Sequence, residues 1–211
     1  MPLPSNAGSA TTEDAEAREL DAAMDRFARG DDAAFEQVYR LGAGRVQRFL
    51  LRMGNDAALA DDLTQDTFLR VHAARGAFEL GATARPWLLA IARNTFLDSM
   101  RRAKVRRKSA DATKAAQQAE PPMAAGETQG DEALIGREML DLVSTTLAKL
   151  SPLVREAFVL VRFEGLTMNE AAEVLGTTEA AVKVRAFRAY EALREALGPE
   201  LGVGEGAAGK S

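Results

Sequence analysis

A polar segment rich in small residues limits what this chain can fold into. Residues 109–133 read SADATKAAQQAEPPMAAGETQGDEA, a composition that is typical of a flexible linker rather than of a packed element. On both sides of it, apolar residues recur at helical spacing. The sequence of 211 residues therefore predicts an all-α protein with two helical domains, over residues 15–108 and 134–198. We expect the ends of the chain, residues 1–14 and 199–211, to be disordered tails.

Helix-boundary signals divide the first domain into four helices. In chain order they are Gly30 at the end of the first helix, Asp31 as a cap for the second, Gly54 at its end, Asn55 or Asp56 as a cap for the third, and Pro86 in the first turn of the fourth. Proline costs little in a first turn, because the N–H group that it lacks has no partner within the helix there. In the second domain, Ser151 followed by Pro152 opens a helix over residues 152–163 in the same way.

The composition excludes several classes of protein. There is no cysteine, so a disulfide framework and cysteine-ligated zinc are excluded, and a reducing cytosol suits the chain. The first twenty residues lack the basic and apolar regions of a signal peptide. No stretch approaches 18 consecutive apolar residues, so we expect no membrane insertion and a cytoplasmic location.

Charge is distributed unevenly along the chain. The formal net charge is −4, yet residues 93–108 hold seven basic residues and one acid. Such asymmetry indicates a polyanion partner for one surface. Trp87 and Phe96 lie close to this basic run, and aromatic rings offer a stacking platform to exposed bases. The alternative is a solvated helix end, where basic residues are favoured by the helix dipole.

Residues 166–193 have the pattern of a helix-turn-helix. Thr167 and Glu170 form a capping box, Gly176 suits the left-handed position that ends a helix, and Thr178 can cap the next helix. The turn is therefore about three residues long, as this motif requires. The alternative is a surface hairpin of two helices with a solvated basic face.

The second helix of this motif has two distinct faces. Val182, Ala186, Ala189 and Leu193 form one stripe that we expect to be buried. Ala180, Lys183, Val184 and Phe187 then lie on the face that would enter a major groove. Two apolar side chains outside the core stripe need a partner, either a thymine methyl group or a protein surface.

The string ADDLTQDTFL, residues 60–69, places polar residues on one helix face. Asp62, Gln65, Asp66 and Leu69 follow the i, i+3, i+4, i+7 spacing. The two carboxylates could hold Mg²⁺, as in the aspartate-rich helices of isoprenoid synthases. That interpretation needs a second acidic motif and a large apolar cavity, and the sequence has no second motif. A docking face or a solvated face is the simpler interpretation.

We expect no cofactor and no metal site. His72 is the only histidine, so it has no partner for a histidine-based metal site or a catalytic triad, and we predict a structural role for it. No glycine-rich phosphate loop opens a helix. The sequence therefore does not predict an enzyme.

Taken in series, these stretches resemble the extracytoplasmic-function (ECF) group of bacterial sigma factors. Residues 60–78 are similar to the family's core-polymerase-binding helix, and residues 84–102 are similar to its helix for melting and reading the −10 element. Residues 148–197 are similar to its −35-reading domain. The resemblance implies that residues 15–108 are sigma domain 2, that residues 134–198 are sigma domain 4, and that residues 109–133 join them.

The resemblance also implies roles for individual residues. Those that would dock to the polymerase are Asp62, Gln65, Asp66 and Leu69. Those at or near the opened −10 strand would be Trp87, Arg93, Asn94, Arg101, Arg102 and Lys104, with the loop 78–84 shaping a pocket for a flipped base. Those facing the −35 duplex would be Thr178, Glu179, Ala180, Lys183, Val184, Arg185 and Arg188.

Some positions depart from the family pattern. Val184 stands where a small polar residue is common, Ala186 where a larger aliphatic is common, and Tyr190 where a basic residue is common. His72 stands where an aromatic residue is frequent. The small Ala186 leaves core volume that Phe187 or Tyr190 could fill.

The resemblance implies core RNA polymerase, promoter DNA and an anti-sigma factor as partners, with no small-molecule substrate. It implies a sigma factor that directs promoter-specific initiation, while the polymerase performs the chemistry. The alternative is a stand-alone dimeric helix-turn-helix regulator, which would form a stable dimer on palindromic sites.

Overall fold

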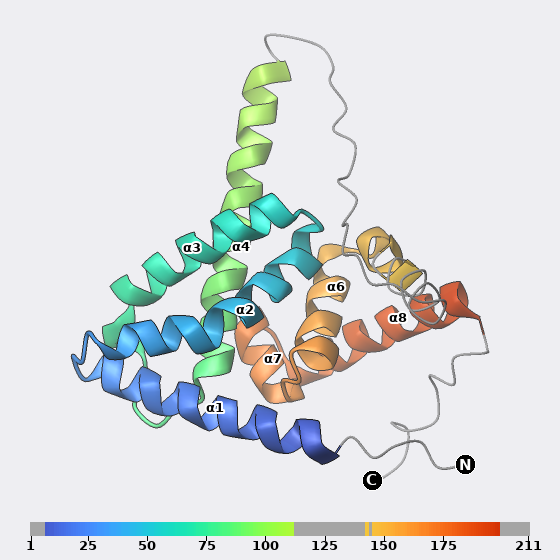
Figure 1. The fold of residues 1–211 in the computed structure, drawn as a ribbon. Helices are drawn as coiled ribbons and strands as arrows, with labels where there is room; N and C mark the ends of the chain where they lie inside the picture. The colour runs from blue at the N-terminus through green and yellow to red at the C-terminus, as the bar shows by residue number, and fades with distance from the viewer. Residues whose placement is uncertain (1–6, 112–141, 144, 199–211) are drawn as a thin grey trace, which may run out of the picture. The chain divides into compact units, whose positions relative to one another are not determined.

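The computed structural model describes residues 7–111, 142–143 and 145–198, and within these ranges every regular element is a helix (Figure 1). The chain divides into two compact units, residues 1–121 and 122–211. The described residues of each unit pack around their own core. None of the described helices is long and apolar enough to cross a membrane. Most of the predicted linker and the predicted tail 199–211 lie outside the described residues.

The first unit is a bundle built around α2. Its elements are α1 (Ala7–Ala28), α2 (Ala34–Gly54), α3 (Ala57–Ala73), the short 3₁₀ helix η1 (Arg75–Ala77) and α4 (Ala84–Asp111). Helix α2 contacts α1, α3 and α4, and α4 also contacts α1 and α3. The largest fully buried side chains of this unit include Met24, Phe27, Phe49, Leu50 and Leu89. Burial of Leu20, Met24 and Phe27 is what the spacing of α1 predicts.

A glycine lets α2 approach two neighbouring helices closely. Gly42 is buried, and a Cβ atom there would lie 3.2 Å from side-chain atoms of both Leu88 on α4 and Phe68 on α3. Real Cβ atoms rarely have such short contacts, so glycine sets the spacing of the three helices. Gly44 lies two residues further along α2, and a Cβ atom there would meet only the flexible guanidinium of Arg48.

Helix boundaries in this unit agree in part with the predicted caps. Asn55 takes the left-handed conformation (φ 53°) that ends α2, and the Asp56 carboxylate accepts from the Leu59 N–H at 3.0 Å to cap α3. The prediction for Asp31 was wrong. The N-cap position of α2 is Ala33, which makes no side-chain cap bond. The Asp31 carboxylate instead faces the Arg26 guanidinium at 3.9 Å, because the intervening turn carries it away from the helix end.

Two helices are longer than predicted. Helix α1 begins at Ala7, inside the segment 1–14 that we predicted to be a disordered tail. Helix α4 continues to Asp111, three residues into the predicted linker. Neither residues 7–14, which read AGSATTED, nor residues 109–111, which read SAD, contain proline, so no residue of these extensions breaks the helix.

The second unit contains α6 (Pro152–Phe158), the π-helical turn η2 (Val159–Phe163), α7 (Met168–Leu175) and α8 (Glu179–Leu197). Helix α8 contacts α6 and α7. Leu147, Val154, Phe158, Ala189 and Leu193 form a buried apolar cluster, with Tyr190 packed against it. Residues 145–149 are also helical, and the Arg155 guanidinium donates to the carbonyls of Leu147 at 2.8 Å and Ala148 at 2.6 Å. Arg155 thus supplies partners for carbonyl groups that a helix end leaves unpaired.

The predicted helix over residues 152–163 changes its hydrogen-bond pattern midway. Its last five residues form η2, and the Glu164 N–H donates to the Val159 carbonyl, five residues back. Ser151 is the N-cap residue, with Pro152 at the first helical position, but the Ser151 side chain makes no cap bond. The wider turn leaves Glu164 buried against the unit. The apolar spacing of the sequence does not distinguish this turn from an α-helix.

Candidate nucleic-acid interface

Helices α7 and α8 form the predicted helix-turn-helix, and its local signals are confirmed. The Thr167 hydroxyl accepts from the Glu170 N–H at 3.2 Å, and the Glu170 carboxylate accepts from the Thr167 N–H at 2.8 Å. Gly176 has φ 60°, in the left-handed region where glycine is favoured. The Thr178 hydroxyl accepts from the Ala181 N–H at 3.2 Å and caps α8. The direction in which α8 leaves the turn is therefore set by short-range bonds.

The buried stripe of α8 fixes which face is exposed. Val182, Ala186, Ala189 and Leu193 are all buried, as predicted. The residues assigned to the −35 duplex are exposed, except for the half-buried Arg185. They are Thr178, Glu179, Ala180, Lys183, Val184, Arg185 and Arg188. Lys183 and Arg188 are exposed cations on the same side of α8 as the exposed Val184 and Phe187, so this face can bind phosphates and also contact base edges.

Of the large apolar side chains near Ala186 in sequence, only that of Tyr190 packs against the buried cluster of this unit. Val184 is 51% exposed and Phe187 is 62% exposed, so neither side chain packs into the core. The Tyr190 ring instead lies edge-on to Phe158, with 5.1 Å between ring centroids. The two apolar side chains on the exposed face are therefore available to a partner.

Helix α3 presents the predicted polar face to solvent. Asp62, Gln65, Asp66 and Leu69 are exposed, and Leu69 reaches 70%. The opposite side of α3 is buried and includes Thr64 and Thr67, whose hydroxyls donate to carbonyls one turn back. Among the residues that the structure describes, no cluster of three or more histidine, aspartate or glutamate side chains could hold a metal ion.

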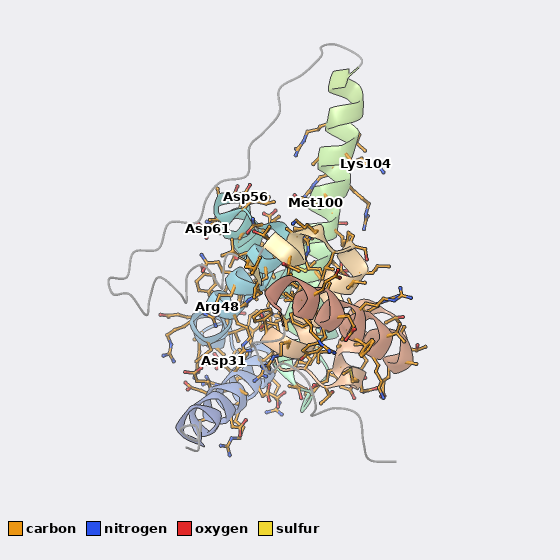
Figure 2. All side chains as sticks on the ribbon, turned by 90° about the vertical axis from the view of Figure 1, so that its right-hand side faces the viewer. Asp31, Arg48, Asp56, Asp61, Met100 and Lys104 are labelled. Carbon is orange, nitrogen blue, oxygen red and sulfur yellow. The ribbon has the colours of Figure 1, made fainter. Side chains whose placement is uncertain are left out.

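The basic end of α4 projects from the first unit. Figure 2 labels Met100 and Lys104 on the part of α4 that extends past the other helices of this unit. Arg101, Arg102 and Lys104 are exposed, and so is Asn94 earlier in the helix, whereas Arg93 is half-buried. A single helix thus carries exposed cations along a part that is not covered by the bundle, where a polyanion has access to them.

Only one of the two aromatic residues near this run is accessible. Trp87 is half-buried, and its ring lies edge-on to Phe78 with 5.4 Å between centroids. Phe96 is only 8% exposed and packs over Gly54, so the prediction that it offers a stacking platform was wrong. The physical reason is that Gly54 leaves a space against α4 that the Phe96 ring fills.

An acid inside the basic run links two of the candidate faces. The Asp98 carboxylate accepts from the Arg70 guanidinium of α3 at 2.8 Å, and Arg101 lies 3.2 Å from its other oxygen. The hydrogen bond from Arg70 holds the pKa of Asp98 below its ordinary value, and the charges of Arg70, Arg101 and Arg102 act in the same direction. The sequence shows Asp98 only as the single acid among seven basic residues and does not indicate its partner. Its partner on α3 lies 28 residues away, so no local pattern indicates the pair.

Two acids on α1 contact the loop before α4, and sequence reasoning assigned them no role. The Asp21 carboxylate accepts from the Ala84 N–H at 2.7 Å, and the Asp25 carboxylate accepts from the Gly81 N–H at 2.9 Å. The four-residue spacing of the acids places them on one helix face. The sequence shows this spacing, but it does not indicate the partners, Gly81 and Ala84, which lie 56 and 63 residues further along the chain.

The single histidine packs among aromatic rings. His72 lies edge-on to Phe35, with 5.1 Å between centroids, and 5.5 Å from the Phe27 ring. Arg75 covers the Phe27 ring from 5.4 Å and pairs with Asp32. These contacts join α1, α2, α3 and η1 and agree with a structural role for His72.

Comparison with known proteins identifies the family to which the chain belongs. The Sigma-70 region 2 model matches residues 38–106, and the Sigma-70 region 4 model matches residues 140–193. RNA polymerase sigma factor CarQ of Myxococcus xanthus is 39% identical over 175 residues, covering 83% of this chain and 95% of CarQ. ECF RNA polymerase sigma factor SigC of Mycobacterium tuberculosis (strain CDC 1551 / Oshkosh) is 34% identical, covering 79% of this chain and 84% of SigC.

Solved structures agree with these relatives. The sigma factor RpoE in complex with the anti-sigma factor NepR from Bartonella quintana has a TM-score of 0.62 at 28% identity, and the match covers 77% of this chain and 96% of RpoE. CnrH in complex with the cytosolic domain of CnrY has a TM-score of 0.60 at 27% identity, covering 86% of this chain and 97% of CnrH. The chain with a capped helix-turn-helix in one unit and a projecting basic helix in the other therefore belongs to the ECF family of RNA polymerase sigma factors.

Proposed function

We propose that this sigma factor joins core RNA polymerase to promoter DNA through three separate helix faces, on α3, α4 and α8. As a member of its family, the chain directs promoter-specific transcription initiation. The observation that carries the proposal is that regions 2 and 4 of the family match separate compact units, and that each unit exposes basic residues on a helix whose apolar stripe is buried.

The exposed face of α3 suits a protein partner rather than DNA. Asp62 and Asp66 bring two carboxylates to this face, and these would be repelled by phosphates. Leu69, 70% exposed, adds apolar surface beside them. Acidic and apolar groups together fit a basic and apolar protein surface. We assign Asp62, Gln65, Asp66 and Leu69 to the contact with core polymerase.

The two basic faces suit different forms of DNA. On α4, a half-buried tryptophan followed by exposed cations fits an opened −10 strand, because rings stack on unpaired bases and cations hold phosphates. On α8, a short exposed face at the start of a capped helix fits the major groove of the −35 duplex. The residues that we assign to the −10 strand are Trp87, Arg93, Asn94, Arg101, Arg102 and Lys104. Those that we assign to the −35 duplex are Thr178, Glu179, Ala180, Lys183, Val184, Arg185 and Arg188. We accordingly assign residues 15–108 to sigma domain 2, 134–198 to domain 4 and 109–133 to the linker between them.

We further propose an anti-sigma factor as a regulatory partner. Its support is that RpoE, a sigma factor with the same fold, was solved bound to the anti-sigma factor NepR. We also propose that the chain acts in the cytoplasm and itself catalyses no reaction, since the polymerase supplies the chemistry. The stand-alone dimeric regulator is not favoured, because sigma factors align with this chain over both units and most of their own length.

Run-off transcription tests the function as a whole. Purified core polymerase is incubated with a library of promoters from the cognate genome, with and without this protein. We expect promoter-specific transcripts only when the protein is present. A stable dimer that binds palindromic duplex DNA tightly without polymerase would instead support the stand-alone regulator.

Asp66→Arg tests the assignment of α3. The reversed charge should weaken binding to core polymerase at least tenfold in a competition assay, because it meets the partner's cations. Binding of the second domain to −35 duplex DNA should not change. Glu16→Arg is the matched control, since Glu16 is an exposed acid on α1 outside the three faces. Equal loss of polymerase binding in both variants would contradict the assignment.

Lys183→Ala tests the assignment of α8. Loss of one phosphate or base contact should weaken −35 binding about tenfold, which corresponds to about 1.4 kcal/mol. Polymerase binding should be retained. Arg194→Ala, at the other end of α8 and also exposed, is the matched control. The division into two recognition units fails if Lys183→Ala impairs polymerase binding as much as DNA binding.

A further inference from the structure

The loop between η1 and α4 is held at three points by groups outside it. Phe78 is buried and packs against Trp87, the Gly81 N–H donates to Asp25, and the Ala84 N–H donates to Asp21. A bond from the Ala82 N–H to the Glu79 carbonyl closes the turn between them. The loop therefore has little freedom, although most of its residues are exposed.

Each of the two acids satisfies a backbone group that the loop itself cannot satisfy. The Ala84 N–H lies at the first position of α4, where no helical carbonyl is available, and a carboxylate there is also favoured by the helix dipole. Gly81 has φ 83°, a left-handed conformation that directs its N–H out of the turn and toward α1. The second oxygen of Asp25 faces the Arg29 guanidinium at 3.5 Å, which keeps the carboxylate aligned.

The residues left exposed on this anchored loop suit contact with a base. The tip carries Glu79 and Leu80 and no cation, so no side chain there attracts phosphates. Leu80 is 51% exposed even though the loop is ordered. Its apolar side chain can pack on an unstacked base, and the Glu79 carboxylate can accept from an exocyclic amino group. Because the loop is already ordered, little conformational entropy is lost on contact.

We propose that Asp21 and Asp25 are positioning residues that set the base preference of this loop at the −10 element. They act through the backbone of residues 81 and 84, without touching DNA. The inference rests on the proposed contact between the first unit and the opened −10 strand. It assigns to α1 a part in promoter recognition, in addition to its part in the core.

The test uses the complete chain bound to core polymerase. The probe is a fluorescein-labelled promoter obtained from the run-off experiment, pre-opened across the −10 element, with each non-template base substituted in turn. Fluorescence anisotropy gives the ratio of Kd values between substituted and parent probes. For the unaltered protein we expect at least a tenfold ratio at one base. Asp25→Ala should reduce the ratio at that base about fivefold or more, and leave the ratios at other bases within twofold.

Conservative variants separate positioning from folding. Asp21→Asn and Asp25→Asn keep an oxygen acceptor and should retain the base preference, and Glu16→Ala should have no effect. The fluorescence of Trp87, the only tryptophan, reports whether the first unit is folded. If an alanine variant does not fold, amide exchange in the unaltered protein provides the test, since the Gly81 and Ala84 N–H groups should be protected.

The outcomes distinguish the inference from the proposed function. Rapid exchange of the Gly81 and Ala84 amides, or full base preference in a folded Asp25→Ala variant, would overturn the inference. If the unaltered protein shows no base preference anywhere in the −10 element, the proposed −10 function itself fails.

Discussion

The two basic helices, α4 and α8, meet their units in different ways. The first half of α4 is packed between α1, α2 and α3, and the exposed cations Arg101, Arg102 and Lys104 follow on a part that projects from the bundle. In α8, buried and cationic residues alternate within the same turns, with Val182 beside Lys183 and Ala189 beside Arg188. Core packing therefore sets the rotation of the basic face directly in α8. In α4, the basic face depends on continuity of the helix and on the pair between Asp98 and Arg70.

Val182→Asp should produce the largest effect and tests the dependence of α8 on its core stripe. Val182 is fully buried, so an unpaired carboxylate there should cost on the order of 4 kcal/mol of unfolding free energy. Amide exchange in α7 and α8 should increase greatly while exchange in the first unit does not change. Val105→Asp is the counterpart on α4. Val105 is 63% exposed, so stability should remain within about 0.5 kcal/mol.

If Val105→Asp destabilised the protein as much as Val182→Asp, the contrast between a packed and a projecting basic helix would be wrong.

Gly42→Val tests the packed half of α4. The added side chain would meet Leu88 on α4 and Phe68 on α3, and overpacking of this kind costs roughly 1–3 kcal/mol. Denaturant unfolding followed by Trp87 fluorescence measures the loss, since Trp87 lies on α4. Gly44→Val is the matched control on the same helix, because only the mobile end of Arg48 lies near its Cβ position. Similar losses in both variants would mean that glycine does not set the spacing of these helices.

Asp98→Asn should have the smallest effect and concerns the projecting half of α4. Because Arg70 keeps the folded-state pKa of Asp98 below its unfolded value, the ionised pair stabilises the fold at pH values above the unfolded pKa. This contribution is lost as the pH falls through the folded pKa. The variant should therefore be slightly less stable than the unaltered protein at pH 7, with the difference vanishing under acidic conditions below the folded pKa.

Denaturant midpoints measured between pH 7 and pH 2.5 give this difference directly. Arg102→Gln is the control, since Arg102 is exposed and acts on Asp98 only through its charge. A difference between Asp98→Asn and the unaltered protein that persisted undiminished at the lowest pH would contradict the role of the ion pair.

Local signals predicted the second unit better than the first. The capping box, Gly176 and the stripe from Val182 to Leu193 concern contacts within one or two helical turns, so the order of residues determines them. The prediction that Asp31 caps α2 was wrong, because neighbouring segments determine which group its carboxylate meets, and that group is the Arg26 guanidinium. The stacking role predicted for Phe96 failed for the same reason, since the space over Gly54 exists only when α2 and α4 are packed together.

The all-helical class, most helix boundaries, the exposed face of α8 and the resemblance to sigma factors can all be predicted from the order of the residues. These follow from periodicity and from cap residues that act over three or four positions. The folded structure was needed to show that Tyr190 rather than Phe187 packs against the core of the second unit, that Asp98 pairs with Arg70, and that Asp21 and Asp25 hold the loop before α4. Each of these contacts joins residues from different helices, and no spacing along the chain indicates which surfaces will meet when the helices pack.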